Sequence, residues 1–248
     1  MALADRVALV TGGGTGLGRA ISLALAEAGC HVAINYSRSE HEAGETAAAV
    51  EVLGRRARPI RADVADDSSV RQMIDTVVGE FGGLDILVNN AGTTRYVPLT
   101  DLEGLTDETW DTILGVNLKG PFHCSRAAAP HLRKSGRGKI INTASNSAFQ
   151  PSGSSIAYMC SKAALVMLTK ALATALAPDI QVNAIAPGWL DTRWVEQHLP
   201  ADVRVAVLSD TTYPPAPLDE LARLVVTLAE IDSLSGQTII VDRGQTML

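Results

Sequence analysis

Seven short runs rich in valine, isoleucine and alanine recur along the chain, and most are apolar on both faces of an extended strand. The runs cover residues 6–11, 31–36, 57–62, 84–90, 138–144, 180–186 and 237–242. Helix-length amphipathic segments separate them, at residues 17–29, 42–53, 67–80, 106–134 and 156–177. Strands buried on both faces are typical of parallel sheets, and their alternation with helices requires right-handed crossovers. The sequence therefore predicts an α/β fold with a doubly wound, seven-stranded parallel sheet flanked by helices.

The chain shows no linker, internal repeat or low-complexity tract along its 248 residues. We therefore expect a single domain over residues 1–248. The one irregular region covers about 187–217 and contains five prolines. A long segment of this kind in a compact domain is typical of a lid over a binding site or of a flexible loop. We expect a substrate lid there.

Composition excludes several classes of function. A net charge of −6 argues against a nucleic-acid partner. The first residues lack the basic segment and long apolar core of a signal peptide, and charged residues interrupt every apolar window of 18 residues, so we expect neither a signal peptide nor a membrane span. Three widely spaced cysteines, Cys30, Cys124 and Cys160, indicate a reducing cytoplasm. The five histidines show no paired ligand spacing, so we expect no metal site.

The first strand-like run leads directly into a glycine-rich loop, TGGGTGLGRA at residues 11–20. The loop fits neither G-x-G-x-x-G, which would end on Leu17, nor the P-loop pattern, which would need lysine at Arg19. A helix beginning near Gly16 nevertheless offers free backbone N–H groups, and glycines allow a phosphate to approach the backbone closely. The loop therefore predicts a site for a dinucleotide pyrophosphate.

The end of the second strand indicates which dinucleotide is bound. Sheets that bind NAD often place an acidic residue there to bond the ribose hydroxyls. Asn35 and Tyr36 occupy those positions here, and Ser37 and Arg38 follow. Without a carboxylate nothing repels a 2′-phosphate, and an arginine can pair with one. The sequence favours NADP(H), with NAD(H) as the alternative.

A tyrosine and a lysine lie one helical turn apart in YMCSK, at Tyr158 and Lys162. This spacing places both side chains on one face of a helix. Ser145 follows the fifth strand, at the carboxyl end where open α/β sheets form their ligand crevice. The sheet and the helix could therefore bring Ser145 close to Tyr158.

Taken in order, these motifs resemble the short-chain dehydrogenase/reductase family, in its compact single-domain group with a Rossmann fold. The glycine loop matches the family pattern T-G-x-x-x-G-x-G, and NNAG at 89–92 matches its fourth-strand signature. The resemblance implies four catalytic residues, Asn117, Ser145, Tyr158 and Lys162. It also implies a cofactor site made by Gly12, Thr15, Gly16, Leu17, Gly18, Tyr36, Ser37, Arg38, Asp63, Val64, Asn90, Ala91, Gly92, Tyr158, Lys162, Pro187, Gly188, Leu190 and Thr192.

The resemblance assigns a role to each catalytic residue. Tyr158 would exchange a proton with a carbonyl or alcohol oxygen as hydride is transferred. Work at neutral pH would need its pKa lowered by about 3 units, which we expect Lys162 to supply by its charge. Lys162 would also bind the nicotinamide ribose, and Ser145 would orient the substrate oxygen. Asn117 would hold a helix backbone and a water that relays protons to Lys162. Thr192 would bond the carboxamide.

Departures from the family pattern bear on the substrate. Relatives that reduce 3-oxoacyl groups on acyl carrier protein usually present basic residues where this chain has Pro130 and Thr174, although Arg133 and Lys134 are near. Arg243 stands where the family commonly has glycine. Candidate pocket segments at 95–97, 146–153 and 189–198 contain five large apolar or aromatic residues that either line the pocket or pack the core: Tyr96, Phe149, Trp189, Leu190 and Trp194. A pocket lined in this way suits a ketone or secondary alcohol.

The leading interpretation is an NADP(H)-dependent carbonyl reductase or alcohol dehydrogenase with a small-molecule substrate. A 3-oxoacyl-[acyl-carrier-protein] reductase is the alternative. A cofactor-sensing protein without catalysis is a minor one, because all four catalytic positions are filled. The resemblance also implies a homotetramer, in which helices 106–134 and 156–177 pair across one interface and the C-terminal strand region meets across another.

Overall fold

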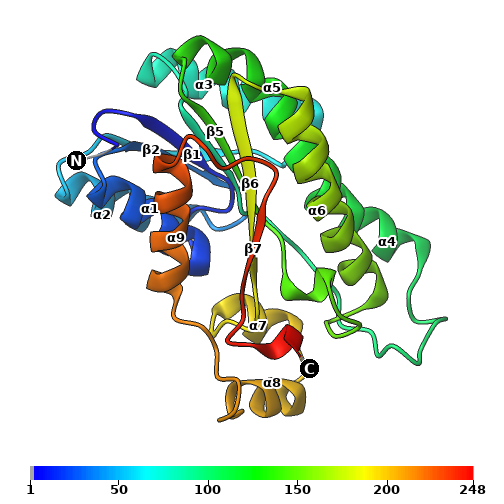
Figure 1. Ribbon diagram of the computed structural model, residues 1–248. Helices are drawn as coiled ribbons and strands as arrows, with labels where there is room; N and C mark the ends of the chain where they lie inside the picture. The colour runs from blue at the N-terminus through cyan, green and yellow to red at the C-terminus, as the bar shows by residue number, and fades with distance from the viewer. Residues whose placement is uncertain (1–2, 248) are drawn as a thin grey trace.

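The computed structural model describes residues 3–247 and places all seven strands in one parallel sheet (Figure 1). The strands are β1 (Val7–Val10), β2 (His31–Tyr36), β3 (Ala57–Arg61), β4 (Ile86–Asn89), β5 (Gly138–Thr143), β6 (Ile180–Pro187) and β7 (Thr238–Val241). Their order across the sheet is β3-β2-β1-β4-β5-β6-β7. The predicted fold class is confirmed. Because the order reverses between β1 and β4, a crevice opens at their carboxyl ends.

Two layers of helices cover the sheet (Figure 1). One layer contains α1 (Gly16–Glu27), α2 (Glu40–Val52) and α9 (Leu218–Glu230), and the other contains α3 (Asp67–Phe81), α5 (Gly120–Ser135) and α6 (Ile156–Ala175). Ile21 of α1 and Val225 of α9 share one buried apolar cluster. Ile74 of α3 and Leu132 of α5 share another. The sheet thus has an apolar core on each face, as its doubly apolar strands require.

The segment 106–134 is not the single continuous helix that the sequence predicts. Helix α4 (Asp107–Leu114) passes into a π-helical turn at Gly115–Lys119, and α5 follows. Glycine has a low helix propensity, and glycines begin and follow the π-helical turn, at Gly115 and Gly120. A Cβ at Gly120 would lie 2.9 Å from Cγ2 of Val64, so the helix passes close to the loop after β3. Wide turns of this kind often occur at functional sites, and Asn117 lies within this one, fully buried.

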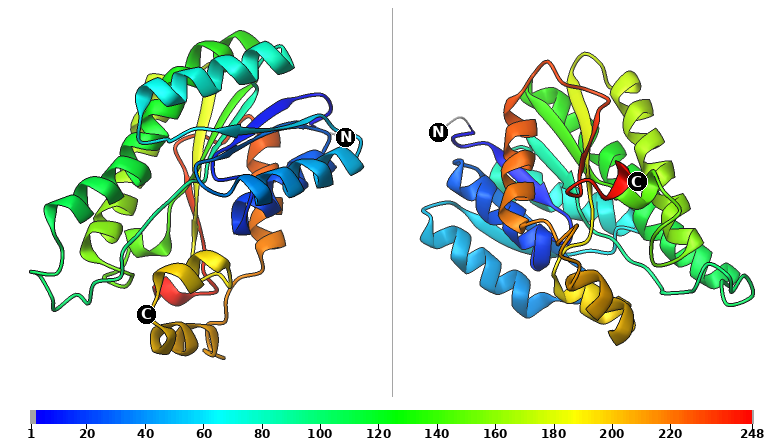
Figure 2. Two further views of the ribbon diagram at one scale, coloured as in Figure 1. Left: turned by 180° about the vertical axis from the view of Figure 1, so that it is seen from behind. Right: turned by 60° about the horizontal axis from the view of Figure 1, so that its bottom comes forward.

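The region 187–217 is also more regular than the sequence indicates. It contains two short helices, α7 (Arg193–His198) and α8 (Ala201–Leu208). Both lie beyond the carboxyl ends of the strands, beside the C-terminal turn (Figure 2). Helix α7 is too short to show a clear apolar period, and the apolar residues of α8, at 203 and 205–208, are spread around the helix rather than confined to one face.

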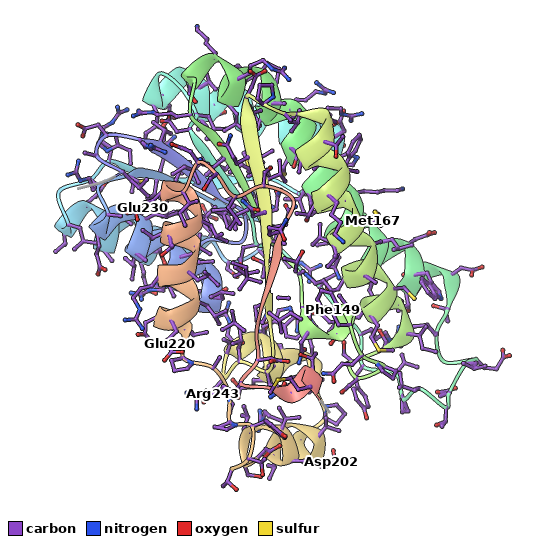
Figure 3. The ribbon with its side chains drawn as sticks, in the orientation of Figure 1. Phe149, Met167, Asp202, Glu220, Glu230 and Arg243 are labelled. Atoms are coloured by element: carbon purple, nitrogen blue, oxygen red, sulfur yellow. The ribbon has the colours of Figure 1, made fainter. Side chains whose placement is uncertain are left out.

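Helix α6 is the one helix within residues 3–247 that is long and apolar enough to cross a membrane, with a mean hydropathy of 1.4. Its inner face buries Leu165 and Leu172 against the rest of the fold. Its outer face exposes Met167 (Figure 3). The apolar composition of α6 therefore reflects packing on the sheet together with an apolar outer surface.

Candidate active site

A cleft of about 630 Å³ lies at the carboxyl ends of the strands, where the sheet order reverses. Every residue predicted to bind the cofactor lines it, as do three of the four catalytic candidates, Ser145, Tyr158 and Lys162. Asn117 is the exception and lies directly behind the wall. Motifs spread from residue 12 to residue 192 therefore meet in one cavity.

The glycine loop is clamped to the loop that follows β4. The Thr11 hydroxyl accepts hydrogen bonds from the backbone N–H groups of Asn90 (2.9 Å) and Ala91 (3.0 Å). The side-chain amide of Asn90 donates to the carbonyl oxygens of Thr11 (3.0 Å) and Gly12 (3.2 Å). These four bonds fix the position of the loop relative to the sheet.

The start of α1 fits a pyrophosphate. Thr15, the residue at its N-cap, makes no side-chain capping bond, and the first turn contains no acidic residue. Its free N–H groups therefore remain available to an anion. A Cβ at Gly18 would lie 2.1 Å from the Gly12 carbonyl oxygen, so only glycine allows this close turn. The residues present thus fit a bound dinucleotide.

The adenosine end of the cleft is formed by the residues at the end of β2 and after β3. Asn35 is buried at the cleft wall, and its side chain bonds within the protein: its Oδ1 accepts from the Gly12 N–H (3.3 Å), and its Nδ2 donates to the Ala62 carbonyl (3.0 Å). It therefore ties the glycine loop to the end of β3. The next residues, Ser37 and Arg38, are exposed and line the cleft.

The guanidinium of Arg38 makes no ion pair or hydrogen bond with any residue between 3 and 247. Asp63, after β3, is exposed on the same part of the cleft, and Val64 is buried next to it. The adenosine end thus combines an unpaired cation with one acidic side chain.

Three consecutive residues at the start of α7 contact three different walls of the cleft. The Thr192 methyl lies 3.4 Å from where a Cβ at Gly16 would stand. Arg193 pairs with Glu42 and donates a hydrogen bond to Ser39 Oγ (3.1 Å). The Trp194 indole N–H donates to the Gly92 carbonyl (3.3 Å).

The Arg193–Glu42 pair spans 151 positions in the sequence. No local pattern indicates such a contact, so the sequence prediction missed it. Through these three residues, α7 closes over the cleft.

Tyr158 and Lys162 lie on α6, and Ser155 caps that helix by accepting from the Tyr158 N–H (3.3 Å). Lys162 Nζ lies 5.7 Å from the centre of the Tyr158 ring and donates to the Thr143 carbonyl (2.7 Å). The Ser145 side chain is hydrogen-bonded to the Tyr158 phenol. Tyr158 and its two partners therefore form one cluster, as the sequence predicts.

The predicted lowering of the Tyr158 pKa is not found. Burial raises the pKa of Tyr158 to about 12, and the hydrogen bond to Ser145 only partly opposes this. Lys162 is also buried, which lowers its pKa to about 8. Desolvation is therefore the largest influence on the pKa values of both Tyr158 and Lys162. At neutral pH the phenol carries its proton, which is the form that can act as a proton donor.

Asn117 connects the π-helical turn to the cleft wall. Its Oδ1 accepts from the Thr93 N–H (2.9 Å), and its Nδ2 donates to the Thr93 carbonyl (3.0 Å) and to Ser161 Oγ (3.0 Å). Asn117 thus holds the loop after β4 rather than a helix backbone. Its contact with Ser161 places it against α6, next to Lys162.

Of the five large residues predicted for the pocket, three line the cleft: Trp189, Leu190 and Trp194. Trp194 lies against the ring of Tyr158, with 5.9 Å between centres, and against His198, at 4.8 Å. Phe149 is exposed on the outer surface (Figure 3), and Tyr96 lies outside the cleft lining. His198, the last residue of the predicted segment 189–198, also lines the cleft and is hydrogen-bonded to the Trp194 carbonyl (2.8 Å).

None of the three cysteines lines the cleft. Cys30 and Cys124 are buried, and burial raises the pKa of each thiol to about 12. Cys160 is exposed on α6. No group of three or more metal-ligating side chains gathers within the described residues.

Replacing Lys162 by methionine is expected to raise the free energy of unfolding at pH 7 by about 1–2 kcal/mol. Burial lowers the Lys162 pKa to about 8 from 10.5, so at neutral pH the fold bears the cost of a desolvated charge, about 3 kcal/mol. Loss of the hydrogen bond to the Thr143 carbonyl offsets part of this gain. Urea unfolding of both proteins measures the difference.

The same substitution should change the pH dependence of stability. Between pH 8 and pH 10.5 the unfolded chain binds more protons at this residue than the native protein does, so native stability rises with pH. The variant lacks that rise. Lys170→Met, on the exposed face of the same helix, is the control. It should change neither the free energy of unfolding at pH 7 nor its dependence on pH. Equal stability of the Lys162 variant and the natural protein at pH 7 would contradict the assigned cost.

The chain is similar to other proteins over nearly its whole length. A family model described as short chain dehydrogenase matches residues 6–202. A protein named as ketoacyl reductase 2 of the granaticin polyketide synthase of Streptomyces violaceoruber is 37% identical, over 98% of this chain and 96% of its own.

Two solved structures share the fold. A short chain dehydrogenase from Burkholderia cenocepacia in complex with NADP has a TM-score of 0.86 and 39% identity, with 98% of each chain covered. A 3-ketoacyl-(acyl-carrier-protein) reductase from Brucella melitensis complexed with NADH has a TM-score of 0.88 and 29% identity, over 98% of this chain and 99% of its own.

Proposed function

Because the chain belongs to the short-chain dehydrogenase/reductase family of oxidoreductases, we propose that it transfers a hydride between NADP(H) and a ketone or secondary alcohol. One observation carries the proposal. The cleft joins a phosphate cradle at α1 to the cluster of Ser145, Tyr158 and Lys162 at the other side. A dinucleotide held at the cradle would reach that cluster with its nicotinamide.

The side chains supply the proton chemistry, and the nicotinamide would supply the hydride. In reduction, Tyr158 donates its phenolic proton to the carbonyl oxygen, and in oxidation the phenolate takes it back. Ser145 donates a hydrogen bond to the same oxygen and orients it. The charge of Lys162 stabilises the phenolate formed when the proton leaves.

The preference for NADP(H) is supported by Arg38. Its unpaired guanidinium lies at the adenosine end of the cleft, and no carboxylate follows β2 at residues 35–38 to repel a 2′-phosphate. The Burkholderia cenocepacia relative is described with NADP and the Brucella melitensis relative with NADH, so the family accommodates both. NAD(H) is therefore the second candidate cofactor.

The substrate class is supported by the wall around Tyr158. Trp194 and His198 form an aromatic side, and Leu190 adds an apolar surface. Apart from Lys162, the lysine and arginine residues among the described residues that line the cleft are Arg38, at the adenosine end, and Arg193, which pairs with Glu42. A small, mostly apolar ketone fits such a wall better than a phosphorylated sugar.

The test is a kinetic comparison of NADPH and NADH with a panel of cyclic and linear ketones and 3-oxoacyl thioesters. We expect turnover of at least one small ketone, with kcat/KM at least about tenfold higher with NADPH, which corresponds to about 1.4 kcal/mol of discrimination. Cofactor binding without turnover of any substrate would support the cofactor-sensing alternative instead.

A 3-oxoacyl-[acyl-carrier-protein] reductase is the second candidate, supported by the names of the granaticin and Brucella melitensis relatives. Pro130 and Thr174 offer no basic side chain for an acidic carrier, and Arg133 is paired with Asp179 (2.7 Å). Saturating kinetics with a carrier-linked substrate, lost on Arg133→Glu together with Lys134→Glu, would favour this candidate.

The remaining expectations are proposals of the same kind. The chain forms one catalytic domain with residues 187–217 as its substrate lid, and it works in the cytoplasm as a homotetramer. The assembly is supported by exposed apolar side chains on neighbouring helices: Phe122 of α5 is 40% exposed and Met167 of α6 is 64% exposed (Figure 3). Sedimentation velocity measures the oligomeric state directly.

A further inference from the structure

The residue after Ser145 links the candidate catalytic serine to the C-terminal turn. Asn146 is buried, with 6% of its surface exposed. Its Nδ2 donates to Gln245 Oε1 (3.0 Å) and, over a longer distance, to Asp242 Oδ2 (3.4 Å). Its Oδ1 accepts a long hydrogen bond from Ser145 Oγ (3.5 Å). Because both acceptors lie on the nitrogen side, the amide oxygen is directed at the serine.

The turn that holds Asn146 is itself rigidly bonded. Asp242 is buried, and its carboxylate accepts from the backbone N–H groups of Gly244 (3.0 Å) and Thr246 (2.9 Å) and from Thr246 Oγ1 (2.8 Å). The side-chain amide of Gln245 donates to the Tyr213 carbonyl (3.1 Å). Both side chains that face Asn146 are therefore held in place by other groups.

The turn also packs closely against the loop after β6. A Cβ at Gly188 would lie 2.7 Å from Gln245 Oε1 and 2.8 Å from Asp242 Cβ. Arg243 lies within the turn in a left-handed conformation, with φ at 54°, which non-glycine residues rarely adopt (Figure 3). The surrounding bonds hold it there, since an unconstrained arginine would leave this region.

The Ser145 hydroxyl has a defined set of partners as a result. Its oxygen accepts from the Ser147 N–H (3.2 Å), and its proton reaches the Asn146 oxygen only over a long distance (3.5 Å), so that proton stays available to a closer substrate oxygen. A hydroxyl held at one rotamer keeps its oxygen beside Tyr158, where a substrate oxygen would bind. Without the Asn146 side chain, the Ser145 hydroxyl would lose this acceptor and keep its bond from the Ser147 N–H.

We propose that Asn146 is a positioning residue for Ser145, and that Asp242 and Gln245 of the C-terminal turn fix its orientation. The inference rests on the proposed function, because it assigns Ser145 to the reacting oxygen. The C-terminal turn would thus orient Ser145 through Asn146 before a substrate binds. A misplaced donor lowers the rate of the chemical step rather than cofactor affinity.

Steady-state kinetics with the best ketone test the role of each partner. Asn146→Ala is expected to lower kcat by about 10–100-fold and Gln245→Leu by about 3–10-fold, with the NADPH dissociation constant changed less than about twofold. Gln237→Leu is the matched control, because its exposed side chain bonds only the Ser235 carbonyl (3.3 Å), and its activity should be unchanged.

A double-mutant cycle separates positioning from a general structural effect. In the Ser145→Ala background, Asn146→Ala should lower kcat no further, since the residue acts through the serine. If the losses in kcat of the two substitutions multiply, or if the kcat of Asn146→Ala is within twofold of the natural value, the inference is overturned. A natural protein that turns over no ketone would instead refute the proposed function.

A crystal structure of Asn146→Ala tests the inference without turnover. We expect Ser145 Oγ to occupy more than one rotamer in the variant and a single one in the natural protein. A single, unchanged rotamer in the variant overturns the inference whatever the substrate is.

Discussion

Replacing Tyr158 by phenylalanine is expected to lower kcat for ketone reduction by about 10³-fold, within the range that general acid catalysis contributes. The substitution keeps the ring and its contact with Trp194, at 5.9 Å between centres, and removes only the hydroxyl that donates the proton. The NADPH dissociation constant should change less than about threefold, since the phosphate cradle at α1 is untouched. Stopped-flow hydride transfer and fluorescence titration with NADPH measure the two quantities.

Tyr96→Phe is the matched control for this substitution. It makes the same chemical change at a tyrosine outside the cleft lining, and we expect activity within twofold of the natural protein. If Tyr158→Phe kept full activity, the proton would come from another group and the assigned mechanism would be wrong.

Replacing Arg38 by aspartate is expected to reverse the cofactor preference. The natural guanidinium is unpaired and available to a 2′-phosphate, whereas an aspartate would repel that phosphate and accept bonds from the ribose hydroxyls of NADH. We expect the NADPH dissociation constant to rise about 100-fold and that for NADH to fall several-fold. Fluorescence titration of both cofactors gives the ratio.

The control for this charge reversal is Arg223→Asp on α9, where the arginine is exposed and only 3.6 Å from Asp219. It changes the net charge equally but lies away from the cleft, so both dissociation constants should stay within twofold. An unchanged NADPH affinity in Arg38→Asp would show that another group recognises the adenosine end.

Much of the fold follows from local sequence. Most strands are apolar on both faces, so their burial follows from local sequence, and seven such runs were enough to predict the parallel sheet. Most of the predicted residues of the cleft came from the family resemblance, and many of them meet because the loops that carry them follow parallel strands that end at one edge. Tyr158 and Lys162 needed only the spacing of a helix.

The features that were missed depend on contacts between distant parts of the chain. The π-helical turn around Asn117 depends on packing against the loop at Val64, which no periodic pattern reports. The role of Asn35 is set by the Gly12 N–H and the Ala62 carbonyl. The closure of α7 depends on a pair between Arg193 and Glu42. Burial, which decides the pKa of Tyr158, is likewise a property of the folded cleft.

The distribution of the cysteines provides a chemical reporter without any substitution. Cys30 and Cys124 are buried, and the pKa of each thiol is raised to about 12, so maleimide reagents should react with neither in the native protein. Cys160 is exposed on α6, the helix whose outer face would be covered in the proposed assembly. The rate of labelling at this single thiol would therefore follow association of the subunits, and a fluorophore attached there would lie two residues from Tyr158.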